Sequence, residues 1–216
     1  MNFEILNKTV LAVAKRKSGK SQLIRYLILL NKHLFNKIFL ICPTECVNSF
    51  YSDILEKRNI RTSYDDDFIK NLIDTMTRAN SNKPETQREN VLLILDDCIS
   101  DANIKTSKPF ELLFTRGRHI NISIIFISQY LKAAITPVIR NNIDFCLFSQ
   151  VNAQGLKLIY DEYNYNLSKQ KFYELFQKAT RDYGFLVINN NSVKNGDIDE
   201  IYGMIKTPQE FLKKII

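Results

Sequence analysis

The sequence predicts an α/β fold in which helices cover both faces of a mostly parallel β-sheet. Three observations support this prediction. Short apolar runs recur along the chain, as expected for strands that are buried on both faces. Segments with helical periodicity separate these runs, which is the order of a parallel sheet with crossover helices. Of the 216 residues, 45% are hydrophobic and 25% are charged, values typical of a globular domain.

The predicted strands share a core of at least four adjacent apolar residues. In chain order they are residues 9–13, 37–42, 91–95, 122–128, 145–148 and 183–188. The predicted helices place apolar residues three or four positions apart. They are residues 23–30, 48–80 (with polar interruptions), 110–118, 133–141, 152–162, 168–180 and 208–216. Residues 80–84 and 189–196 are rich in Asn, Ser, Lys and Gly or Pro, and loops are predicted there.

Composition excludes several classes of protein. No apolar run approaches the ~20 residues that a membrane-spanning helix needs. The N-terminus lacks the charged start and apolar block of a secretory signal, so we expect an intracellular protein. The four cysteines are expected to be free thiols. Cys42 and Cys46 have no histidine nearby, and the chain holds two histidines in all, so no zinc site is expected.

The basic residues are concentrated at the N-terminal end. The net charge is +7, and residues 1–50 hold eight Lys or Arg but two Asp or Glu. This distribution favours a polyanionic partner, either nucleotide phosphates or a nucleic-acid backbone. A charge of +7 also serves solubility, so composition leaves both interpretations open.

A phosphate-binding loop is predicted between the first strand and the first helix. Residues 14–21 are Ala-Lys-Arg-Lys-Ser-Gly-Lys-Ser, and they depart from the P-loop pattern only in having Ala14 for the first glycine. An L-residue can adopt the backbone angles needed there. The residues predicted to bind the nucleotide are Ala14, Lys15, Arg16, Lys17, Ser18, Gly19, Lys20, Ser21 and Gln22.

The residue types in this loop fit nucleotide chemistry. Backbone N–H groups and the helix N-terminus hold the phosphates. Lys20 is expected to reach the β- and γ-phosphates, and the Ser21 hydroxyl to bind Mg²⁺. ATP and Mg²⁺ are therefore the expected cofactors.

Three polar residues follow two of the predicted strands. Asp96 comes directly after the third strand and is expected to hold Mg²⁺, while Asp97 is expected to orient the attacking water. Gln129 follows the fourth strand, where its amide could contact both the γ-phosphate and the water. Without the P-loop, the two aspartates would fit an acidic strand end that caps the next helix. Gln129 would fit an ordinary loop residue.

Together these motifs resemble those of the FtsK–HerA superfamily of P-loop ATPases, and in particular the genome-packaging ATPases of poxvirus-type large DNA viruses and of virophages. The stretches that support the resemblance are 14–21, 92–97, 115–119, 123–129 and 139–144. The resemblance implies a P-loop NTPase core of the RecA/ASCE type over residues 1–150. Residues 151–216 are then a helical and strand extension packed on the same domain.

The resemblance implies a motor that hydrolyses ATP to pump double-stranded DNA into a preformed capsid. Such ATPases act as homo-oligomeric rings, pentamers or hexamers, in which a neighbour's arginine stabilises charge on the γ-phosphoryl group. Arg118 and Arg116 are the first candidates for this arginine and Arg140 is the third, while Arg16 could act within its own subunit. Portal or membrane-vertex proteins of the capsid are implied as further partners. The implied location is the viral factory in the host cytoplasm, and the virion.

Two other functions fit parts of the sequence. A small nucleoside or nucleotide kinase also begins with a P-loop, but residues 141–216 hold one arginine, Arg181, where an arginine-rich lid is expected. An ATP-dependent switch that binds partners and hydrolyses slowly is the second alternative. A cluster of aromatic and lysine side chains at 157–172 either packs in the core or contacts DNA.

Overall fold

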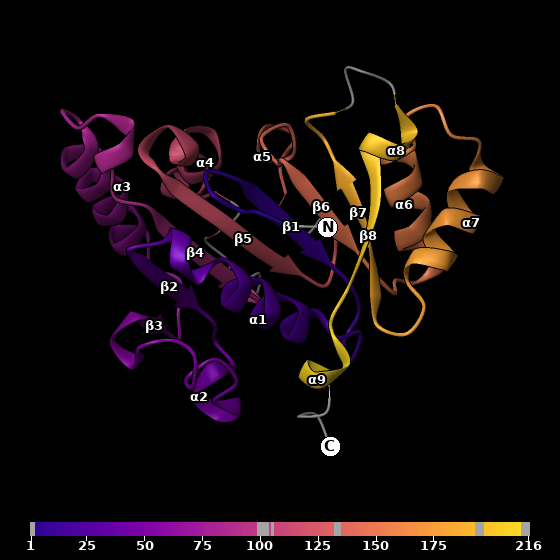
Figure 1. Ribbon diagram of the computed structural model, residues 1–216, viewed down its shortest axis with the longest axis horizontal. Helices are drawn as coiled ribbons and strands as arrows, with labels where there is room; N and C mark the ends of the chain where they lie inside the picture. The colour runs from indigo at the N-terminus through magenta and orange to yellow at the C-terminus, as the bar shows by residue number, and fades with distance from the viewer. Residues whose placement is uncertain (1–2, 99–103, 105, 132–134, 193–196, 213–216) are drawn as a thin grey trace.

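The computed structural model describes residues 3–98, 104, 106–131, 135–192 and 197–212 (Figure 1). Within these residues one eight-stranded sheet has the order β3-β2-β4-β5-β1-β6-β7-β8. The strands are β1 (Thr9–Val13), β2 (Lys37–Ile41), β3 (Ile60–Arg61), β4 (Val91–Asp96), β5 (Ile122–Ser128), β6 (Phe145–Phe148), β7 (Gly184–Asn189) and β8 (Tyr202–Lys206). The strands from β3 to β6 are parallel, and β7 is antiparallel to both its neighbours. The predicted, mostly parallel sheet is confirmed.

Helices cover both faces of this sheet (Figure 1). They are α1 (Lys20–Asn31), α2 (Glu45–Asn48), α3 (Asp66–Asn80), α4 (Lys108–Arg116), α5 (Pro137–Arg140), α6 (Ala153–Tyr163), α7 (Lys169–Ala179), α8 (Ile198–Ile201) and α9 (Gln209–Leu212). Short 3₁₀ segments are η1 (Lys32–Leu34), η2 (Lys57–Asn59), η3 (Glu85–Gln87) and η5 (Gly117–Ile120). No helix among these described segments is long and apolar enough to cross a bilayer.

Alternate residues of the central strands enter two separate hydrophobic cores. Leu92 and Ile94 of β4 pack in the core that α1 covers, whereas Leu93 and Leu95 pack in the core under α3, α4, α6 and α7. Both sets of side chains are buried, which explains why these strands are apolar at every position. This burial is the main source of the stability of the fold.

The predicted helix over 48–80 is wrong between α2 and α3. Ser49 has a left-handed backbone (φ 45°) and ends α2, and the short strand β3 then joins the sheet edge. Residues 65–67 are three successive aspartates. The Asp65 side chain accepts a hydrogen bond from the N–H of Asp67 and so caps the N-terminus of α3. Residues 49–65 therefore form turns, the 3₁₀ segment η2 and the strand β3 in place of a continuous α-helix.

The C-terminal segment also departs from prediction. Strand β8 and helix α8 were not predicted, because β8 is a half-buried edge strand without a continuous apolar run. Helix α9 falls inside the predicted helix 208–216, of which residues 213–216 lie outside the described part. The same holds for residues 193–196 of the predicted turn and for 133–134 of the predicted helix that includes α5.

The register of three parallel strands brings the predicted motifs to one edge of the sheet. Val13, the last residue of β1, is paired with Ser128 at the end of β5. Asp96 at the end of β4 is paired with Ile127. The P-loop, the acidic pair and Gln129 all follow these positions, so they meet at the carboxyl edge, where α/β sheets bind ligands.

Candidate nucleotide-binding site

A cleft of about 510 Å³ opens at this carboxyl edge. The P-loop forms one wall, and the residues after β2 and β4 form the other. The lining residues are Arg16, Lys17, Ser18, Gly19, Lys20, Ser21, Gln22, Cys42, Thr44, Glu45, Phe50, Tyr51, Asp96, Asp97 and Gln129. The structure thus brings together most of the residues that the sequence predicted to bind nucleotide, metal and water.

The P-loop backbone has the curvature of an anion-binding site. Lys17 (φ 61°) and Gly19 (φ 86°) both have left-handed conformations, which turn successive N–H groups inward. A Cβ atom at position 19 would lie 3.2 Å from Cδ1 of Tyr183. Ala14 is not among the described residues with positive φ, and its N–H donates to the Ser128 carbonyl at 3.3 Å. The prediction that an L-residue fits at this first loop position is confirmed.

Two side chains of the loop have groups suited to a phosphate. Lys20 Nζ donates to the carbonyl oxygens of Ala14 (2.5 Å) and Lys15 (3.1 Å). Burial lowers the pKa of Lys20, while the nearby carboxylates of Asp96 and Asp97 oppose that shift. The Ser18 hydroxyl oxygen is buried without a hydrogen-bond partner among the described residues. An anion in the loop would supply acceptors for both groups.

The two carboxylates after β4 have different surroundings. Asp96 is buried, and burial raises its pKa to about 6 although the Tyr51 hydroxyl favours the ionised form. Asp97 is partly exposed and has a left-handed backbone (φ 57°). Gln129 Nε2 donates to Asp97 Oδ2 at 2.8 Å, which links the end of β5 to the acidic pair. A left-handed backbone is uncommon outside glycine and often marks a functional position.

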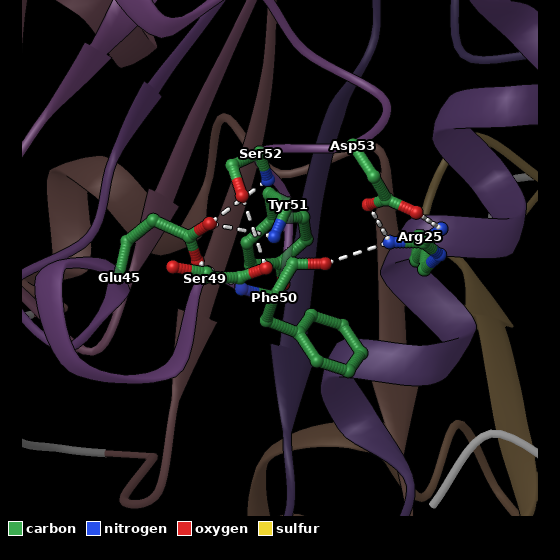
Figure 2. A network of polar contacts seen from close by, with 7 residues as sticks. All are labelled: Arg25, Glu45, Ser49, Phe50, Tyr51, Ser52 and Asp53. Atoms are coloured by element: carbon green, nitrogen blue, oxygen red, sulfur yellow. Dashed lines mark hydrogen bonds and ion pairs between the residues drawn. The ribbon is translucent and has the colours of Figure 1, made fainter.

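Sequence reasoning missed the segment Glu45–Asp53, which we call the strap (Figure 2). Its Tyr51 is 1% exposed, and the Tyr51 hydroxyl donates to Asp96 Oδ2 at 2.9 Å. Arg25 of α1 forms an ion pair with Asp53. No local motif signals these contacts, because Tyr51 and Asp96 are 45 residues apart in sequence.

The predicted arginines are divided between two regions. Arg16 lines the cleft. Arg116 and Arg118 are exposed and precede β5, whereas Gln129 follows it, so a strand of about 20 Å separates them from the cleft of their own chain. Arg140 forms an ion pair with Glu162.

A second cleft of about 460 Å³ lies beside the first and shares Gln129 with it. Lys15 lines this second cleft, together with residues of α6. The aromatic side chains near 160–172 belong to the core instead of a surface patch: Tyr163 and Phe172 are buried, and the Tyr160 ring packs against that of Phe172.

Comparisons with known proteins point to one family. The sequence model described as Poxvirus A32 protein matches residues 6–205. Protein 075L of Invertebrate iridescent virus 6 is 34% identical over 202 residues, which cover 93% of this chain and 77% of that protein. Protein L437 of Acanthamoeba polyphaga mimivirus is 23% identical and covers 94% of this chain and 74% of its own length.

Solved structures share the fold. The genome packaging NTPase B204 from Sulfolobus turreted icosahedral virus 2, in complex with AMPPCP, superposes with a TM-score of 0.63 at 19% identity, covering 94% of this chain and 98% of that chain. The pCW3 conjugation coupling protein TcpA, in its monomer form with ATPγS, gives a TM-score of 0.63 at 14% identity, covering 96% and 65%.

Proposed function

The chain belongs to the poxvirus A32 protein family and is a P-loop ATPase, and we propose that it uses ATP hydrolysis to move double-stranded DNA into a viral capsid. The family match confirms the resemblance that the motifs predicted. The observation that supports the proposal most is the convergence of Lys20, Asp96, Asp97 and Gln129 on one cleft beside the P-loop. The shared fold with a genome packaging NTPase supports the DNA substrate.

Nucleotide binding in this proposal uses the P-loop. Backbone N–H groups around Lys17 and Gly19 bind the phosphates, and Lys20 exchanges its two carbonyl partners for phosphate oxygens. The buried Ser18 hydroxyl, which has no hydrogen-bond partner among the described residues, can donate to a phosphate oxygen. The loop therefore holds donors whose best partners are supplied by the ligand.

Mg²⁺ fits the oxygen groups at the start of α1 and the end of β4. Ser21 and Asp96 would hold it, since Mg²⁺ prefers hard oxygen ligands and needs only one or two from the protein. When bound with the nucleotide, Mg²⁺ neutralises charge on the phosphates. Its binding favours the ionised Asp96, against the burial that raises this pKa.

Asp97 is the proposed base for the attacking water. Gln129 donates to Asp97 Oδ2, and no described residue donates to Oδ1, which can accept a hydrogen bond from water and then its proton. Because Gln129 lies at the end of the strand between β4 and β1, it can contact the phosphate side as well as Asp97. The strained backbone of Asp97 holds its carboxylate at the cleft.

The proposal places part of the catalytic machinery on a neighbouring subunit. Arg116 and Arg118 lie at the opposite edge of the sheet from the cleft, so they can reach a nucleotide only on a second copy of the chain. Arg16 can act on its own nucleotide. We therefore expect an isolated subunit to hydrolyse ATP weakly and a homo-oligomeric ring to hydrolyse it faster, with portal or membrane-vertex proteins of the capsid as further partners.

The test is the steady-state ATPase rate with and without double-stranded DNA, compared for the wild type, Lys20→Ala, Asp97→Asn and the surface control Asp74→Asn. We expect DNA to stimulate the wild type and Asp74→Asn several-fold. The two cleft variants should lose about 10²-fold or more of the rate. Phosphate transfer to an added nucleoside, or a rate that DNA does not change, would contradict the motor.

A further inference from the structure

The Tyr51 hydroxyl contacts Asp96, one of the two residues proposed to hold Mg²⁺. It donates to Asp96 Oδ2 at 2.9 Å, and Ser21 lines the same cleft. A carboxylate only accepts hydrogen bonds, so the single phenol proton points to Asp96. Asp96 is therefore held through Oδ2 by a neutral donor.

The strap backbone is fixed by a buried carboxylate (Figure 2). Glu45 is 5% exposed and accepts from the N–H groups of Phe50 (3.0 Å), Tyr51 (2.7 Å) and Ser52 (2.9 Å). Hydrogen bonds to an ionised acceptor are stronger than neutral ones, and three of them offset the cost of burying the charge. Glu45 thus fixes the backbone position from which the Tyr51 side chain extends.

The strap is also tied to the helix that carries Ser21. Arg25, one turn after Ser21 on α1, forms a two-pronged ion pair with Asp53 and donates to the Phe50 carbonyl at 2.7 Å. Its guanidinium lies 5.7 Å from the centre of the Phe50 ring. The contacts on both sides of Tyr51 therefore hold the phenol at a fixed distance from the first turn of α1.

We propose that Tyr51 is a positioning residue for the metal site: its hydroxyl holds Asp96 by Oδ2, so that Asp96 Oδ1 stays available to the metal of a bound Mg–nucleotide. The inference rests on the proposed function, which assigns Asp96 and Ser21 to Mg²⁺. Residues that orient a metal ligand in this way commonly change metal affinity 10–100-fold when they are replaced.

The test is Tyr51→Phe, which removes only the hydroxyl. Mn²⁺ replaces Mg²⁺ as the probe, and its electron paramagnetic resonance signal reports free ion during titration of protein saturated with ATPγS. We expect Mn²⁺ to bind about tenfold more weakly to Tyr51→Phe. The affinity for ATPγS in EDTA should change less than about twofold, because the P-loop is untouched.

Tyr202→Phe is the matched control. Tyr202 lies on the edge strand β8, and its buried hydroxyl donates to the carbonyl of Tyr163 at the end of α6. The variant should leave Mn²⁺ binding unchanged. Asp53→Asn, at a carboxylate that is 54% exposed, is the milder second variant should Tyr51→Phe fold poorly, and we expect it to weaken Mn²⁺ binding two- to threefold.

Unchanged Mn²⁺ affinity in both strap variants would overturn the inference and leave the proposed function standing. Equal losses of metal and metal-free nucleotide affinity would also overturn it, because Tyr51 would then only support the fold. A wild type that binds ATPγS but no Mn²⁺ would overturn the metal assignment itself.

Discussion

The P-loop and the strap are two walls of one cleft, and they satisfy their polar groups in opposite ways. Within the part of the chain that the structure describes, Lys20 donates to two backbone carbonyls and the Ser18 hydroxyl is buried without a partner. In the strap, Glu45 accepts three backbone N–H groups and Tyr51 donates to Asp96. The polar groups of the loop need an anion as a partner, whereas these polar groups of the strap have partners within the protein. We infer that the loop serves binding and the strap serves rigidity.

Glu45→Ala should give the largest loss of stability. It leaves the N–H groups of three strap residues, one buried and two partly buried, without their acceptor, and a buried unpaired N–H costs about 1–3 kcal/mol. We expect the free energy of unfolding to fall by about 3 kcal/mol or more, measured by urea denaturation. Glu56→Ala, at an exposed residue next to the strap, should change it by less than about 0.5 kcal/mol. Equal effects of the two variants would remove the contrast between strap and loop.

Asp96→Asn should stabilise the ligand-free protein at neutral pH. Burial raises the pKa of Asp96 from 3.8 to about 6, so the ionised carboxylate destabilises the folded state. Between pH 4 and 6 the folded state binds more protons than the unfolded state, because the pKa of Asp96 is higher in the folded state. Wild-type stability therefore falls as pH rises from about 4 to 6. The gain from the variant should therefore grow over this window to the order of 2–3 kcal/mol and stay constant above it. A gain that is independent of pH would contradict the buried, ionised carboxylate.

Gly19→Ala should have a smaller effect, in the loop. The left-handed backbone at Gly19 costs an L-residue about 1–2 kcal/mol, and the new Cβ would press on Tyr183. We expect the free energy of unfolding to fall by that amount and ATPγS affinity to fall with it. Adding Tyr183→Ala should recover only part of the loss, because it relieves the contact and not the backbone. Full recovery would show that crowding, and not backbone conformation, determines the requirement for glycine.

Lys20→Ala should change stability least. The lysine loses only two backbone hydrogen bonds, and burial already disfavours its charge. The free energy of unfolding of the ligand-free protein, measured by thermal denaturation, should therefore change by no more than about 1 kcal/mol in either direction. Stabilisation by added ATPγS should disappear. A strongly destabilised variant would mean that this lysine supports the fold, which would break the contrast between the two walls.

The sequence allowed prediction of those parts of the site that are local motifs. The P-loop, Asp96-Asp97 and Gln129 each follow a buried strand, so their meeting at one edge follows from a parallel sheet. The strap could not be predicted, because its contacts join Tyr51 to Asp96 and Arg25 to Asp53 across 45 and 28 residues. The helix predicted over 48–80 includes part of the strap, but the Glu45 carboxylate accepts the N–H groups of residues 50–52 that such a helix would use. Likewise, β8 lacks the continuous apolar run that identified the other strands.

The position of the arginines follows from strand direction. Arg118 precedes β5 and Gln129 follows it, so the two side chains belong to opposite edges of the sheet. The assignment of Arg116 or Arg118 as the arginine that a neighbouring subunit contributes stays a prediction.

The most direct test of the central claim is movement along DNA. A triplex-forming oligonucleotide bound to linear double-stranded DNA is displaced by any protein that translocates through its site. We predict that the assembled wild-type protein displaces the oligonucleotide with ATP, and that neither ATPγS nor Asp97→Asn supports displacement. ATP hydrolysis that proceeds at full rate without displacement would contradict a DNA-translocating motor.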